Sequence, residues 1–195
     1  MTGSRTPGPP GSELLTRRGA LRSLALGGAG ALALLARPRA ALAEASATRR
    51  IVLHNTHTLE SLAIDYCRDG SYCGPALAAV NQVLRDHRNG AVHPIDPALL
   101  DLLHAAAARC DRDPEFEVIS GYRSPESNAA MHAHSAGVAA KSLHMEGRAI
   151  DVRLVGCDLE RLRAAGLALG QGGVGYYYGP QFVHLDTGRV RNWVG

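Results

Sequence analysis

The sequence lacks several features that would place it at once in a broad class of protein. Its longest apolar run, at about residues 24–35, is shorter than the roughly 20 residues that a membrane-spanning helix needs. No basic stripe with interleaved aromatic residues is present, so nothing favours a nucleic-acid partner. The 195 residues are 46% hydrophobic and 20% charged, with a net charge of +3. These values are normal for a globular protein, so we expect one ordinary domain with an appendage.

The first 43 residues resemble an export signal. Arg17 and Arg18 precede a weakly hydrophobic segment rich in Gly and Ala, as in a twin-arginine signal. Ala41-Leu42-Ala43 gives the small-x-small pattern of a signal-peptidase site. We therefore expect a twin-arginine signal peptide at 1–43, a single exported, periplasmic domain at 44–195, and no membrane span after cleavage. An uncleaved N-terminal anchor is the alternative.

The chain contains no C-x-x-C pair, which argues against a cysteine zinc site. Four cysteines are present, namely Cys67, Cys73, Cys110 and Cys157. An exported protein can form disulfides, and the spacing favours Cys67–Cys73 and Cys110–Cys157. Thiols buried as small hydrophobic groups are the alternative.

The hydrophobic pattern of the exported part predicts an α+β fold. Helical spacing and capping residues predict helices at 74–88, 96–110, 124–135 and 159–170, the first ending in "RDHRNG" with Gly90 as its cap. Alternating apolar residues predict strands in 49–64, 116–123 and 149–155, and in the segments "GGVGYYYG" and "FVHLDTG". We expect a small antiparallel sheet with helices packed mainly on one side.

Three residues suggest a metal site. A catalytic zinc usually takes three His, Asp or Glu ligands and keeps a fourth position for water. Asp151 lies on the predicted strand face opposite the apolar side chains, and His184 on the last strand shares its face with Asp186. Together with His144 these residues could meet in one cleft. The H-x(6)-D spacing alone is not a restrictive pattern.

Three segments taken in order make the pattern specific. "SGYRSPESN", "SLHMEGRAID" and "GGVGYYYGPQFVHLDTG" resemble the zinc D-alanyl-D-alanine peptidase group, related to the lysostaphin and hedgehog folds, and within it the MepK-like murein endopeptidases. The S-x-H-x-x-G-x-A-x-D motif is complete in 142–151. The resemblance implies a hedgehog-like fold, Zn²⁺ held by His144, Asp151 and His184, and hydrolysis of peptidoglycan stem-peptide cross-links. We expect a monomer.

The resemblance also implies a role for Arg123, in the "SGYRS" turn. The matching basic residue in the group is thought to bind substrate or to stabilise the developing oxyanion, and a permanently charged guanidinium suits both tasks. A structural ion pair with Glu126 is the alternative. Tyr122 and Tyr177 are expected to join Arg123 in binding substrate.

The general base is the point at which the sequence departs from the group. Several members carry an acidic residue three positions before the last histidine ligand, where this chain has Gln181. We expect Asp186 to act as the base. Alternatively, Asp186 orients His184, or one of His132 and His134 accepts the proton.

Two further segments are not expected to form sites. "GGVGYYYG" lacks the Lys-Ser/Thr of a phosphate-binding loop. His54 and His57 are three residues apart on an extended segment, which would place them on opposite faces.

The expected activity is a zinc-dependent murein endopeptidase, cutting either 4–3 or 3–3 cross-links. The alternatives are a non-catalytic zinc-stabilised wall-binding domain, a D,D- or L,D-carboxypeptidase, and, least favoured, a disulfide-rich binding module.

Overall fold

The computed structural model describes residues 48–134 and 139–195. The predicted signal segment, 1–43, lies outside the described residues. The elements follow in this order: β1 (Arg49–Asn55), β2 (Ser61–Arg68), β3 (Ser71–Tyr72), α2 (Gly74–Val83), α3 (Pro97–Arg109), β4 (Glu115–Ser120), α4 (Pro125–His134), the 3₁₀ turn η1 (Leu143–Glu146), β5 (Ala149–Leu154), α5 (Leu159–Leu169), β6 (Gly173–Tyr177), β7 (Phe182–Asp186) and β8 (Arg191–Val194). None of the described helices is long and apolar enough to cross a membrane.

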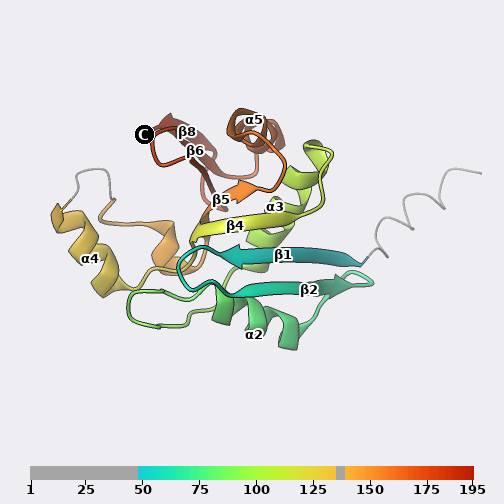
Figure 1. The fold of residues 1–195 in the computed structure, drawn as a ribbon, viewed down its shortest axis with the longest axis horizontal. Coiled ribbons are helices and arrows are strands. Elements are labelled where there is room, and N and C mark those ends of the chain that lie inside the picture. The colour runs from blue at the N-terminus through green and yellow to red at the C-terminus, as the bar shows by residue number, and fades with distance from the viewer. Residues whose placement is uncertain (1–47, 135–138) are drawn as a thin grey trace, which may run out of the picture. The chain divides into compact units, whose positions relative to one another are not determined.

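The described strands form one sheet in the order β3-β2-β1-β4-β5-β7-β6-β8 (Figure 1). The α+β prediction is confirmed, but the sheet is larger than expected and it is mixed. The pairs β1–β4 and β6–β8 are parallel, and the other pairs are antiparallel. The sequence did not predict β2 as a separate partner of β1, nor the short strands β3 and β8.

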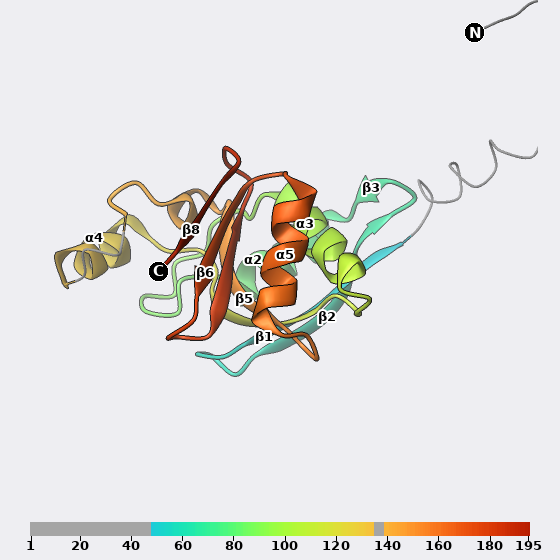
Figure 2. The ribbon, with the colours of Figure 1, turned by 90° about the horizontal axis from the view of Figure 1, so that it is seen from above.

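Three helices share one hydrophobic core with the sheet. α2, α3 and α5 contribute Val80, Leu103 and Leu162 to the same buried cluster as Ile150 and Leu185 of the central strands. α3 and α5 also contact each other and lie side by side (Figure 2). The side chains of β5 and β7 that alternate with Ile150 and Leu185 therefore point to the opposite face of the sheet.

The helix expected at 74–88 ends at Val83, five residues earlier than predicted. The cause is Asp86, which is fully buried and bonds to the backbone of its own turn and of the segment after β4. Its side-chain oxygens accept hydrogen bonds from the N–H groups of Arg88 and Ser124, and its carbonyl accepts one from Gly90. Since Asp side chains that bond to nearby backbone compete with helical hydrogen bonds, 85–90 forms a turn.

None of the four cysteines is in a disulfide, so neither predicted bond is present in the structure. The sulfur of Cys67 accepts a hydrogen bond from Arg49 instead. Cys73 is the N-cap residue of α2. Burial and a hydrogen bond with Cys157 raise the pKa of the Cys110 thiol to about 11. Cys110 and Cys157 are therefore neighbours, as the sequence suggested, but they are present as thiols.

Candidate metal centre

His144 is held by the 3₁₀ turn η1. The Ser142 hydroxyl caps this turn by accepting a hydrogen bond from the N–H of His144, and Gly147 ends it in the left-handed conformation, with φ +65°. A Cβ at Gly147 would lie 2.1 Å from the carbonyl oxygen of Pro94, so only glycine fits there. The Ser and Gly of the 142–151 motif therefore fix where the imidazole lies.

Asp151 and His184 come from the two neighbouring central strands. The antiparallel register pairs Asp151 of β5 directly with His184 of β7, so their side chains point to the same face. That face is opposite to the helix-covered core.

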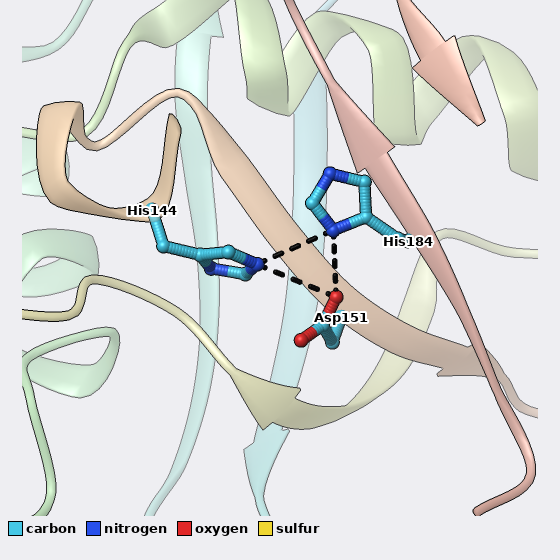
Figure 3. A group of neighbouring side chains, drawn as sticks. All are labelled: His144, Asp151 and His184. Atoms are coloured by element: carbon cyan, nitrogen blue, oxygen red, sulfur yellow. Dashed lines mark hydrogen bonds and ion pairs between the residues drawn. The ribbon is translucent and has the colours of Figure 1, made fainter. Parts of the chain in front are cut away.

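The three side chains meet at one point (Figure 3). His184 Nδ1 lies 2.8 Å from Asp151 Oδ1 and 3.3 Å from His144 Nε2. His144 Nε2 lies 3.4 Å from the same Asp151 oxygen. Ligand atoms held at about 2.1 Å from one tetrahedral zinc are roughly 3.4 Å apart. Among the described residues, this is the group of three or more His, Cys, Asp or Glu side chains close enough to hold a metal ion.

Hydrogen bonds on the far side of each ring determine which nitrogen faces the centre. His144 Nδ1 lies 2.7 Å from the carbonyl oxygen of Gly121, and His184 Nε2 lies 3.0 Å from Asp186 Oδ2. Each of these acceptors takes the N–H of the neutral ring. The lone pairs of His144 Nε2 and His184 Nδ1 then point at the carboxylate of Asp151. Three electron-rich atoms converge in a buried place, which is an arrangement that fits a cation.

The electrostatics of the centre agree with this geometry. Burial alone would raise the pKa of Asp151, but His144 and His184 outweigh it and hold this pKa well below its usual value. Burial alone would lower the pKa of His184, but Asp151 and Asp186 outweigh it and raise this pKa. The same two carboxylates that favour a proton on His184 would also favour a metal ion at the centre.

Asp186, expected to be the base, lies behind His184 rather than in the cleft. It is fully buried, and its oxygens accept hydrogen bonds from the N–H groups of Gly173 and Gly188 and from the guanidinium of Arg191. The bond to His184 Nε2 adds to these. This placement matches the alternative in which Asp186 orients His184. No sequence pattern predicted that Arg191 would bind Asp186, because a turn separates the two residues.

The centre opens into a cleft of about 450 Å³. Arg123 and Tyr177 line it, as expected for substrate-binding residues. Trp193, which gave no functional signal in the sequence, lines it too, and its ring centroid lies 5.1 Å from that of His184. Tyr122 does not line the cleft, because it is buried and its ring stacks on His93.

Arg123 is buried and its charge has no direct counter-ion. It is 7% exposed, its Nη1 donates to Asn128 Oδ1, and its Nε has no hydrogen-bond partner. Within the described residues it forms no ion pair, so the alternative with Glu126 is not seen. Burial lowers the pKa of Arg123, whereas the charge of Asp151 raises it. The guanidinium is thus poised to bind an anion or an oxyanion in the cleft.

The remaining candidates for a base lie elsewhere. Gln181 lines a separate groove and its side chain donates to the carbonyl oxygen of Tyr178. His132 and His134 are exposed on α4 and do not line the cleft. Among the described cleft residues Asp151 is the sole carboxylate, and His57 is the sole histidine apart from the two at the centre. His57 was not expected to be a ligand, because its spacing from His54 on an extended segment would place the two side chains on opposite faces. It lies instead in the turn between β1 and β2, which borders this cleft.

Metal binding is expected to release a proton from His184 at mildly acidic pH. Its pKa is raised above 6.5 in the metal-free protein, so below that pKa a metal ion must displace the proton from Nδ1. Apparent affinity for Zn²⁺, measured by titration calorimetry, should weaken as the pH falls through the raised pKa. An affinity that is the same at about pH 8 and at about pH 5 would contradict this account.

The comparisons with known proteins cover nearly the whole described chain. A family model described as Peptidoglycan L,D-endopeptidase MepK matches residues 43–193. The chain is 39% identical over 171 residues to Peptidoglycan L,D-endopeptidase MepK of Escherichia coli (strain K12), covering 87% of this chain and 94% of that protein. It is 37% identical over 175 residues to the Probable peptidoglycan L,D-endopeptidase MepK of Haemophilus influenzae, covering 88% and 94%.

No solved structure matches the chain. The family match spans far more than half of the sequence, and both relatives are matched over most of their own length. The resemblance found in the three sequence segments is thereby confirmed, and with it the peptidase character of the chain. This protein belongs to the family described as Peptidoglycan L,D-endopeptidase MepK.

Proposed function

We propose that this protein is a zinc-dependent peptidase that cleaves stem-peptide cross-links of peptidoglycan after export through a twin-arginine signal at 1–43. The observation that carries the proposal is the convergence of His144 Nε2, His184 Nδ1 and Asp151 Oδ1 at the floor of a cleft. Two imidazoles and one carboxylate are a typical ligand set for catalytic zinc. The names of the relatives supply the substrate class.

The L,D designation in those names favours one type of cross-link. A 3–3 link joins the carbonyl of an L-centre of one diaminopimelate residue to the amine of a D-centre of another. A 4–3 link instead begins at the carbonyl of D-alanine. We therefore extend the 3–3 specificity to this chain.

The zinc ion, when bound, would supply a water of lowered pKa and polarise the scissile carbonyl. The protein's own residues provide the rest. Arg123 lines the cleft and presents its positive charge to the substrate in a buried place, where an interaction with negative charge is worth most. Tyr177 and Trp193 form apolar walls for the peptide. Asp186 keeps the Nε2–H of His184 in place and so keeps Nδ1 directed at the centre.

A proton acceptor must face the cleft, and we assign this role to His57. The assignment rests on elimination, because Asp186 is sealed and Asp151 is needed as a ligand. The ring of His57 stacks on His87, with centroids 3.8 Å apart, and its backbone N–H donates to Asn55 Oδ1. These contacts hold the imidazole at the rim of the cleft. A neutral imidazole is a suitable base near pH 7.

Loss of a ligand should remove metal and activity together. His184→Ala deletes one of three donors, so zinc content and cleavage of cross-linked muropeptides should both fall to background. Zinc can be quantified by elemental analysis and products by chromatography, with and without a chelator. His134→Ala, which changes an exposed histidine outside the cleft, is the matched control. A zinc-loaded, folded wild type that yields no products would overturn the peptidase and favour a non-catalytic wall-binding domain.

Asp186→Asn should weaken the metal site rather than only the chemistry. The amide removes the charge that fixes the Nε2–H of His184, so zinc affinity should fall about 10- to 100-fold. Asp101→Asn is the control. Asp101 lies on α3 and accepts hydrogen bonds from the hydroxyls of Tyr66 and Tyr72, which belong to the strands at the other end of the sheet from His184. If Asp186→Asn binds zinc with normal affinity and yet loses activity, Asp186 is the base after all.

His57→Gln should keep the metal and lose most of the rate. Removing a general base commonly costs about 100-fold or more. Zinc content should match that of wild type, because His57 is not a ligand. A variant that retains kcat within about threefold of wild type would exclude His57 as the base.

A further inference from the structure

The cleft holds more positive charge than the metal centre uses. Four cationic side chains line it, namely Arg88, Arg123, Lys141 and Arg191. Arg191 is neutralised by two close contacts with buried Asp186. Lys141 is exposed and stands beside η1. Arg88 and Arg123 remain, and hydrogen bonds join the two segments that carry them.

Three hydrogen bonds join the turn that carries Arg88 to the turn that carries Arg123. The N–H of Tyr122 donates to the carbonyl oxygen of Leu84, at 2.7 Å, and the N–H of Ser124 donates to Asp86 Oδ2, at 2.9 Å. Asn89 Nδ2 donates to the hydroxyl of Ser124, at 2.8 Å. The two guanidiniums are therefore presented to the cleft from adjoining segments.

The described residues leave a net positive charge in this corner. Arg88 forms an ion pair with Asp86, at 3.5 Å, and Asp86 also accepts hydrogen bonds from two backbone N–H groups. Among the described residues, Arg123 has no ion pair, and its buried Nε has no hydrogen-bond partner. One carboxylate thus faces two guanidiniums that line the same cleft, and an anion bound between them would balance the remaining charge.

Arg123 also lies beside the metal centre, because its backbone N–H donates to the carbonyl oxygen of His144, at 3.1 Å. Arg88 and Arg123 therefore lie next to the place where the scissile bond would be held. In a 3–3 cross-link, the carbon attached to the scissile nitrogen carries a free carboxylate. After cleavage, this carboxylate belongs to the product that carries the new amine.

We propose that Arg88 and Arg123 form a subsite for the free carboxylate next to the scissile nitrogen, so that the enzyme selects cross-links in which this group is not amidated. The inference rests on the proposed function. Guanidinium groups bind carboxylates by charge-assisted hydrogen bonds that a neutral carboxamide cannot replace. Arg88 lies in the "RDHRNG" segment, whose sequence predicted only a helix end.

The test compares two purified cross-linked peptides that differ only in a carboxylate or a carboxamide at this carbon. The readout is the ratio of kcat/KM for the free acid to kcat/KM for the amide. Wild type should give a ratio of about ten or more, and Arg88→Gln should bring the ratio toward one. Arg88→Lys, which keeps the charge but not the fork, should give an intermediate ratio. Arg68→Gln, an exposed arginine of β2 outside the cleft, should keep the wild-type ratio.

Three results would overturn the subsite. These are a wild-type ratio near one, a wild-type ratio retained in Arg88→Gln, or a ratio that collapses in Lys141→Gln but not in Arg88→Gln. The last result would place the carboxylate at Lys141. Failure of wild type to cleave either peptide, with zinc bound, would instead overturn the proposed function and this subsite with it. Zinc content measured for every variant confirms that the centre is intact.

Discussion

The pairing of β5 with β7 is the constraint on which the site depends. It sets Asp151 opposite His184, and because side chains alternate along a strand, it also sends Ile150 and Leu185 into the helix-covered core. A slip of one residue would bury the ligands and expose the core. The apolar side chains that stabilise the fold therefore also hold the register of the two strand-borne ligands. His144 is added from outside the sheet by a short turn that tolerates only glycine at its end.

The charges around the paired strands β5 and β7 favour a cation at the centre. Asp186 is buried and held by Arg191 and two backbone N–H groups, so it stays ionised with its pKa well below the usual value. It acts on the centre only through His184. Asp151 is then the one carboxylate that lines the described part of the cleft, and four cationic side chains line it as well. Such a cleft favours a metal ion at its floor and negative charge on the substrate beside it.

The sequence predicted the parts of this arrangement that are local. The 142–151 motif and strand alternation were enough to predict that His144, Asp151 and His184 meet. Asp96 was enough to predict the start of α3, and Gly170 the end of α5. The rest depends on contacts between distant segments. The helix at 74–88 is cut short because Asp86 binds the N–H of Ser124, 38 residues away. For the same reason no sequence rule placed Arg88 or His57 at the cleft.

The structure also changes what Gln181 means. The lack of an acid at position 181 would favour a non-catalytic domain if that position lined the cleft. Gln181 instead has a left-handed backbone, φ +58°, at the turn between β6 and β7, and it lines a separate groove together with Glu117 and Arg153. The glutamine therefore takes no carboxylate away from the described lining of the cleft.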